Sequence, residues 1–166
     1  MNCVIDVQYQ KDSALAAALL FSHWQTDQIE QTILKPITFV APYQSGAFFK
    51  RELPCILALL EEIHEPLEFI IIDGFVTLGK AQKEGLGMHL YNALNQSIPI
   101  IGVAKNAFSE TPKETEILRG QSQKPLYISA VGISLNQAKQ LIQQMHGEYR
   151  IPTLLKKVDQ LCREIP

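Results

Sequence analysis

The segment Phe69–Asp73, followed by Gly74, constrains the fold of this chain more than any other segment. Its apolar residues end abruptly in a carboxylate and a glycine. Four apolar residues in a row favour a strand that is buried on both faces, and Asp73 would then lie where that strand leaves the core. A carboxylate at that place is a candidate ligand, whereas the alternative is an ordinary Asp-Gly turn after a strand.

Length and composition favour a chain with one sizeable core. Of the 166 residues, 46% are hydrophobic, and we expect a single domain over residues 1–166. The formal net charge of -2 argues against a strongly basic nucleic-acid binder. Any binding of nucleic acid must therefore rest on local patches.

The cysteines and the apolar stretches bear on the cellular compartment of the protein. Cys3, Cys55 and Cys162 are odd in number and lack a CxxC or Cys/His spacing, which favours reduced, buried thiols in the cytoplasm and implies no zinc site. Asp6 interrupts the first apolar stretch, and no apolar run approaches the ~20 residues of a membrane span. We expect a cytoplasmic protein that is a monomer and has no membrane partner.

The first third of the chain reads as three strands. Residues 3–9 have strand-forming types, and a period of two places Asp6 on the face opposite Ile5 and Val7. Residues 15–24 are ambiguous between strand and helix, and residues 32–40 read as a strand interrupted by a proline. Because the links are short, we expect an antiparallel meander.

A loop and a helix follow. The turn-rich segment 41–47 carries Tyr43 at its tip, which is either a platform for a base or a side chain that covers the core. From Leu53 the apolar positions 53, 56, 57, 60 and 63 predict an amphipathic helix with Pro54 in its first turn. Glu52 stands at its entrance, where a negative charge is favourable in itself by a fraction of ~1 kcal/mol.

The remainder alternates between helices and strands. We expect a loop at 74–83, a helix with its apolar face at 86, 90, 93 and 94, a strand at 98–104, a mobile loop or loose hairpin at 106–124, a strand at 126–133, a helix from 135 and a closing helix from about 152. Lys105 ends the strand before it much as Asp73 does, although a solvated terminus explains it equally well. Ser134, with Gln137 three residues on, has the pattern of a helix cap.

Two carboxylates meet if the strand 69–72 pairs with the strand 3–9. Neighbouring strands are only ~4.8 Å apart, so Asp6 and Asp73 would then lie side by side. Such a pair is unfavourable unless a cation lies between the two groups, and a hard ion such as Mg²⁺ satisfies both. Glu52 could supply a third oxygen.

The motifs of the chain resemble those of a known family. Asp6 within Ile-Asp-Val, the segment Pro42–Gly46, Arg51–Pro54, Asp73-Gly74 and Ile100–Lys105 appear in the order and approximate spacing of endonuclease V. The resemblance covers residues from about 3 to 146. The chain is similar to a diverged and shortened member of that family.

The resemblance implies an α/β, ribonuclease H-like fold, with a mixed sheet of three antiparallel strands followed by alternating helices and strands, flanked by helices. It implies a nuclease that depends on Mg²⁺, with Mn²⁺ as a substitute, and that hydrolyses a phosphodiester 3′ to inosine or another altered base in DNA or RNA. The implied catalytic and metal-binding residues are Asp6, Asp73 and Glu52, with Lys105 stabilising charge on the phosphate. The implied wedge is Tyr43, and the residues implied for the pocket of the extruded base are Gly46, Phe48, Gly74 and Leu86.

The chain departs from the family pattern in places. Ser134 stands where the resemblance implies a further active-site aspartate, at the start of the penultimate helix. The loop 75–80 lacks the usual histidine and second glycine, Ser45 replaces a proline, and the stretch between Lys105 and Leu126 is short. Two alternatives follow: a non-catalytic nucleic-acid-binding relative with an incomplete metal site, and a small-molecule-binding α/β domain that keeps remnants of the motifs.

Overall fold

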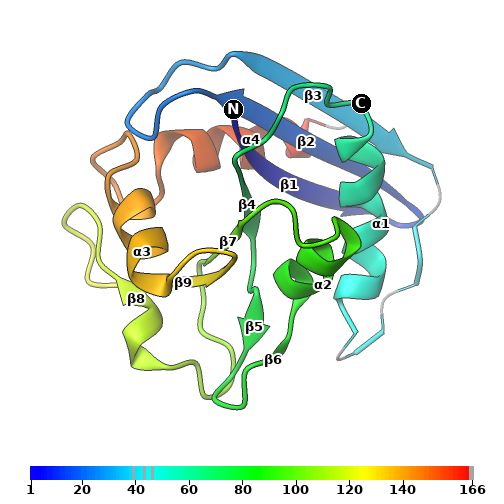
Figure 1. Ribbon diagram of the computed structural model, residues 1–166. Coiled ribbons are helices and arrows are strands. Elements are labelled where there is room, and N and C mark those ends of the chain that lie inside the picture. Colours follow the sequence, from blue (N-terminus) through cyan, green and yellow to red (C-terminus); the bar gives the residue numbers. More distant parts are fainter. Residues whose placement is uncertain (39, 43, 46, 165–166) are drawn as a thin grey trace.

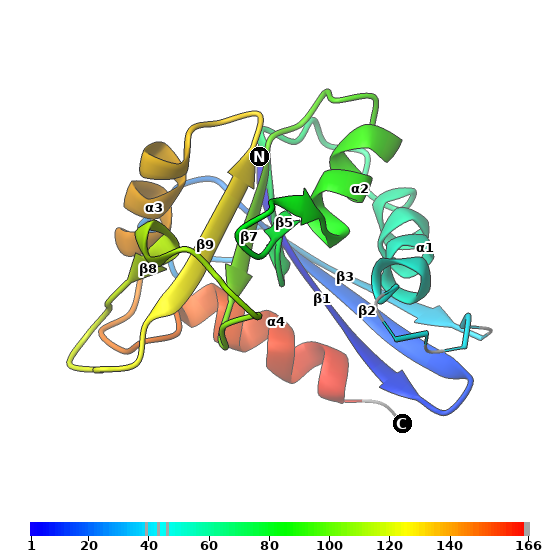
Figure 2. The same ribbon diagram turned by 90° about the horizontal axis from the view of Figure 1, so that it is seen from below.

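A computed structural model of the chain describes residues 1–38, 40–42, 44–45 and 47–164. In these ranges the main element is a seven-stranded mixed sheet in the order β3-β2-β1-β4-β7-β9-β8, with helices on both faces (Figures 1 and 2). Its strands are β1 (Asn2–Gln10), β2 (Ser13–Phe21), β3 (Gln31–Ile37), β4 (Phe69–Asp73), β7 (Ile100–Ala104), β8 (Glu116–Ile117) and β9 (Leu126–Val131).

The predicted antiparallel meander is confirmed. β1 pairs with β2 and β2 with β3, both antiparallel. The alanine-rich segment that was ambiguous by period is the strand β2, which is buried almost throughout because the sheet is covered on both faces. Pro36 lies in β3, at the edge of the sheet, where the missing backbone donor is tolerated.

Two pairs of helices cover the sheet. α1 (Phe49–Leu60) and α2 (Leu86–Ala93) pack on one face, and α3 (Leu135–Gln143) and α4 (Thr153–Arg163) pack on the other (Figure 2). Each pair buries apolar residues in its own core cluster, on either side of the strands. Within the described ranges, no helix has both the length and the apolar character to cross a bilayer.

The helix expected from Leu53 begins earlier. α1 starts at Phe49, so Pro54 lies beyond the first turn and Glu52 lies within it. The pattern of apolar residues did not reveal this start because Lys50 and Arg51, in the first turn, are polar. Phe49, the first residue of the helix, stacks on His89 of α2, with ring centroids 3.7 Å apart. The missing N–H of Pro54 leaves the helix with one fewer backbone hydrogen bond.

Two segments that were expected as loops contain further structure. Residues 74–83 include β5 (Thr77–Leu78), which pairs with β6 (Lys83–Glu84). Residues 106–124 include a 3₁₀ turn at Lys113–Thr115 and the edge strand β8. They also contain Arg119, which is only 3% exposed and donates hydrogen bonds to four backbone carbonyls between Met145 and Arg150. β8 pairs antiparallel with β9, so the end of this segment forms one side of a hairpin, and the buried guanidinium anchors it.

Candidate metal centre

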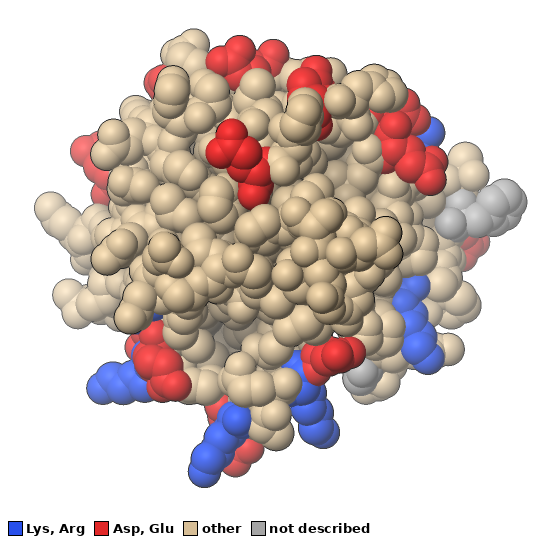
Figure 3. Space-filling view, in the orientation of Figure 1, with Lys and Arg blue, Asp and Glu red and all other residues tan. Residues whose placement is uncertain are grey.

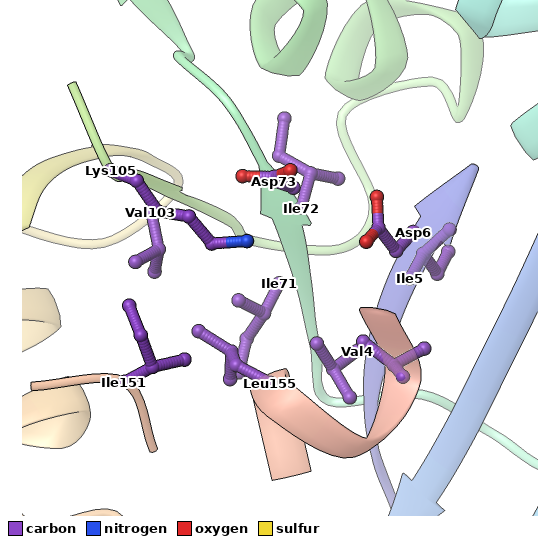
Figure 4. A pocket seen from close by; sticks show the side chains of 11 residues that line it. Val4, Ile5, Asp6, Ile71, Ile72, Asp73, Val103, Lys105, Ile151 and Leu155 are labelled. Carbon is purple, nitrogen blue, oxygen red and sulfur yellow. The ribbon is translucent and has the colours of Figure 1, made fainter. Parts of the chain in front are cut away.

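The sheet brings Asp6 and Asp73 together, as predicted. β1 runs parallel to β4 in a register that pairs Ile5 with Ile72, so the next residue of each strand is an aspartate. Figure 4 shows both carboxyl groups pointing toward the same space at the ends of these strands. Asp6 is 7% exposed and lies on the face opposite Ile5, also as predicted.

Glu52 reaches this place from α1. The guanidinium of Arg51 lies 4.0 Å from the centroid of the Tyr9 ring, and this cation–π contact fastens the first turn of α1 to the end of β1. Glu52 is 5% exposed, and its Oε2 has no hydrogen-bond partner within the described part of the chain. A buried oxygen without a partner is costly in protein alone, and a cation would satisfy it.

A third aspartate, which the sequence interpretation missed, comes from α4. Asp6, Asp159 and Cys162 each offer one ligand atom, and these atoms lie within 4.8 Å of one another. Asp159 also accepts a hydrogen bond of 3.1 Å from Arg163 Nε. The sequence did contain a signal for Asp159. Leu155, Asp159 and Cys162 have the i, i+4, i+7 spacing of one helix face, and Leu155 and Cys162 pack against the sheet.

Ser134 does not occupy the place of a site carboxylate, so that expectation is wrong. β9 runs antiparallel to β7 and pairs Val131 with Ile100, which puts Ser134 beyond the amino end of β7. Lys105 lies beyond the opposite end of the same strand. The Ser134 hydroxyl accepts a 3.2 Å hydrogen bond from Gln137 N in a capping box, so the predicted helix cap is confirmed. Asp159 of α4 is instead the further carboxyl group close to Asp6.

The carboxyl groups disfavour one another's charge. Burial raises the pKa of Asp6 to about 7, and the Asp73 charge and a hydrogen bond with Asp159 add to the effect. Burial, then Asp6 and Asp73, raise the pKa of Glu52 well above its ordinary value. Burial also raises the pKa of Asp73, although the Lys105 ammonium opposes this. Clustered carboxyl oxygens of this kind fit a hard divalent cation, which would relieve the repulsion.

Lys105 directly follows β7, and its side chain extends toward the end of β4 (Figure 4). Its backbone carbonyl accepts a hydrogen bond from the guanidinium of Arg150. Arg150 also donates to the carbonyls of Lys124, at 3.0 Å, and Pro125, at 2.8 Å. One side chain thus joins the end of β7, the start of β9 and the segment before α4.

The turn after Asp73 is fixed by close backbone contacts. Gly74 has φ of +134° and donates to the Val103 carbonyl at 3.1 Å, and Val76 N donates to Ser129 Oγ at 2.9 Å. Gly102 faces this turn, and a Cβ there would lie 2.5 Å from the Gly74 carbonyl oxygen. The absence of a side chain at Gly102 therefore permits the turn to pack against β7.

An open cavity adjoins the carboxylates. It is lined by Asp6, Val7, Tyr9, Phe48, Glu52, Asp73, Gly74, Ala104, Lys105 and Asn106. Of the residues implied for a base pocket, Phe48 and Gly74 line this cavity, whereas Leu86 is buried in the core with α1. The other two predicted substrate residues, Tyr43 and Gly46, lie outside the described residues.

The family model for Endonuclease V matches residues 3–124, which is most of the chain. The chain belongs to the endonuclease V family. Endonuclease V of Pyrococcus horikoshii is 30% identical, over 96% of this chain and 71% of its own length. Endonuclease V of Streptomyces avermitilis is 28% identical, over 96% of this chain and 77% of its own length.

Solved endonuclease V structures share the fold. The crystal structure of the Streptomyces avermitilis protein superposes with a TM-score of 0.74 at 26% identity, covering 98% of this chain and 79% of that one. Ciona intestinalis endonuclease V was solved with a 24mer DNA containing an inosine followed by a ribo-adenosine. It gives a TM-score of 0.78 at 19% identity, covering 98% of this chain and 84% of that one. The endonuclease V fold is ribonuclease H-like, so the predicted fold class and family are confirmed, and the family is one of nucleic-acid endonucleases.

Proposed function

We propose that this member of the endonuclease V family is a Mg²⁺-dependent nuclease that cleaves a phosphodiester 3′ to inosine or another altered base in DNA or RNA, with Mn²⁺ as a substitute. The observation that carries the proposal is that Asp6 lies next to Asp73 by strand pairing and next to Asp159 of α4, beside a buried oxygen of Glu52 that has no hydrogen-bond partner among the described residues. These groups come from a sheet and two helices on opposite faces of it, so the fold brings them to one point.

Asp6, Asp73, Asp159 and Glu52 would hold the cation. When bound, Mg²⁺ supplies Lewis-acid chemistry, because it polarises a phosphate oxygen and makes water more acidic. Glu52 would accept a hydrogen bond from the attacking water and so orient it. The Lys105 ammonium, next to Asp73, would offset the negative charge that develops on the phosphate in the transition state.

The charge distribution supports a nucleic-acid substrate. On the face drawn in Figure 3, most Lys and Arg side chains lie along the lower edge with Asp and Glu side chains among them, whereas the upper part carries mostly Asp and Glu. The carboxyl end of β4 points toward that lower edge in Figure 1. The Lys and Arg side chains at this edge can contact the phosphate backbone although the formal net charge of the chain is -2.

An altered base would enter next to the carboxylates. Phe48 is 46% exposed and shares the cavity with Gly74 and Asp73, so an aromatic ring and an open stretch of backbone border the candidate metal centre. We assign Phe48, Gly74 and Gly46 to recognition of the extruded base and Tyr43 to the wedge that replaces it in the stack, whereas the burial of Leu86 in the core removes it from this set.

Cleavage assays test the proposal. The substrates are labelled single-stranded DNA, duplex DNA and RNA, each with and without one inosine, in Mg²⁺ and separately in Mn²⁺, with Asp73→Asn as the matched variant. Inosine-dependent nicking that disappears in Asp73→Asn supports the full proposal. Cutting without inosine preference retains the nuclease and removes the base assignment. No cutting of any substrate by the folded protein would overturn the proposal.

The non-catalytic alternative has lost its main support. It depended on Ser134 replacing a carboxylate ligand, but Ser134 caps α3 at the other end of the sheet. Asp159 restores the number of acidic groups next to Asp6.

A further inference from the structure

Cys162 adds a thiol to the candidate metal centre. It lies on α4 three residues after Asp159, and it is 0% exposed. Its Sγ lies within 4.8 Å of a carboxylate oxygen of both Asp6 and Asp159. The other two cysteines are outside this cluster, so the thiol at this place is a specific feature and not a general property of the core.

Sulfur and oxygen donors select different cations. Mg²⁺ takes oxygen ligands in an octahedral arrangement and does not use a thiol. Zn²⁺ and the softer Cd²⁺ bind thiolates, and Zn²⁺ combines Cys with Asp ligands in tetrahedral sites. Two ligand atoms of one tetrahedral zinc ion lie about 3.6 Å apart. The separations within this cluster, at most 4.8 Å, therefore require only a small inward movement of the side chains.

The surroundings of the cluster also point to a cation. Glu52 is 5% exposed, borders the same cavity as Asp6, and its Oε2 has no hydrogen-bond partner among the described residues. A divalent ion next to Asp6 would supply a partner for this buried oxygen.

We propose that Asp6, Asp159 and Cys162 form a site for a thiophilic divalent cation, of which Zn²⁺ and Cd²⁺ are the probes, and that this site overlaps the Mg²⁺ site through its two aspartates. The spacing of the cysteines gave no sign of it because two ligands are aspartates and one of them comes from β1. Because both ions need Asp6 and Asp159, they compete. The thiophilic ion therefore blocks cleavage, a consequence that rests on the proposed nuclease function, whereas its binding does not.

The first experiment titrates Cd²⁺ into metal-free protein and follows the ultraviolet charge-transfer absorption of a cadmium–thiolate bond. We expect the band to saturate at one equivalent in the parent and to be lost in Cys162→Ser. The matched control is Cys55→Ser, which removes another buried helical thiol that also donates to a backbone carbonyl one turn earlier. This control keeps the band.

The second experiment measures Zn²⁺ affinity by calorimetry. Loss of the sulfur ligand in Cys162→Ser should weaken Zn²⁺ binding by about tenfold or more. Cys162→Ala provides a second variant if the serine protein does not fold. A band that is retained in both Cys162 variants, or that is absent from the folded parent, would overturn the site.

A third experiment separates the site from the nuclease. Zn²⁺ is added to cleavage reactions at fixed Mg²⁺, and we expect the parent to be inhibited at lower Zn²⁺ than Cys162→Ser. If the parent cleaves no substrate, the proposed nuclease function is wrong. The cadmium–thiolate band still tests whether Cys162 binds the cation. If cleavage of parent and variant is equally sensitive to Zn²⁺, the overlap with the Mg²⁺ site is wrong.

Discussion

The guanidinium of Arg150 donates a hydrogen bond to the backbone carbonyl of Lys105, the residue at which the chain leaves β7. The same guanidinium holds the carbonyl of Pro125, just before β9, at 2.8 Å. Arg150 therefore fixes the backbone from which the Lys105 side chain extends toward Asp73. We regard Arg150 as a positioning residue, because it acts through Lys105 and lines no part of the cavity.

Replacing Arg150 should reduce turnover more than substrate binding. We expect Arg150→Ala to lower kcat by about tenfold, with a smaller change in KM, because a misplaced ammonium stabilises the transition state less well. Arg150→Lys can make only part of the three contacts and should recover only part of the rate. The measurement is steady-state cleavage of an inosine-containing oligonucleotide. An unchanged kcat in Arg150→Ala would show that the contact is dispensable.

Asp159 and Ser134 make a pair of variants with opposite expected outcomes. Asp159→Asn should abolish detectable cleavage and weaken Mg²⁺ binding, because it removes a charge next to Asp6. Ser134→Ala should lower the free energy of unfolding by about 1 kcal/mol through loss of the helix cap and should leave cleavage intact. Calorimetry with Mg²⁺ and chemical denaturation measure the two effects. The reverse pattern would return the ligand role to Ser134.

The part of the site that lies on paired strands could be predicted from the sequence. Asp6 and Asp73 each break an apolar strand, and strand adjacency then brings them together. Asp159 was not recognised because an acidic residue on an amphipathic helix looks like part of a solvated face. Its spacing with Leu155 and Cys162 was the available signal, and the docking of α4 across the sheet brings it next to Asp6.

The fold, too, was predictable where it follows from short-range patterns and not where it depends on long-range contacts. The meander, the buried strands and the cap at Ser134 follow from short-range patterns and are confirmed. The anchoring of the segment 106–124 was not predicted because Arg119 binds carbonyls about thirty residues away in the sequence. Long-range anchoring of this kind leaves no periodic signal in the local sequence.

Gly102 should not tolerate a side chain. In Gly102→Ala the new Cβ would lie 2.5 Å from the Gly74 carbonyl oxygen and 2.7 Å from Ser129 Oγ, so the turn after Asp73 must move. We expect a loss of about 1–3 kcal/mol in the free energy of unfolding, as for overpacking elsewhere, together with reduced cleavage. Denaturant unfolding and cleavage rates measure these effects. Wild-type values for both would show that the turn is not held by this contact.

The stability of the metal-free protein should fall as the pH rises. The pKa of Asp6 is raised from 3.8 to about 7 in the folded state, so the folded protein holds a proton that the unfolded chain releases near pH 4. Its contribution is complete below the unfolded value and is lost as the pH rises through about 7. Glu52 and Asp73, whose pKa values are also raised, act in the same direction.

Thermal unfolding at pH 5.5 and pH 8, with and without Mg²⁺, tests this dependence. We expect Mg²⁺ to raise Tm more at the higher pH, where the carboxyl groups are charged and the repulsion that the cation relieves is greatest. In the Asp6→Asn variant without metal, Tm should fall less between pH 5.5 and pH 8 than it does in the parent. A Tm that is equal at both pH values without metal would contradict the proposed crowding of charge.

The position of Asp159 on α4 also has a consequence for the order of events during folding. The parallel pairing of β1 and β4 sets only two of the three aspartates in place, and the third arrives when α4 packs across the sheet. Contacts between residues so distant in sequence carry a large loop-closure entropy and tend to form late. Nascent or partly folded chains would therefore lack the means to cut nucleic acid, and hydrolytic competence would emerge only with the completed tertiary structure.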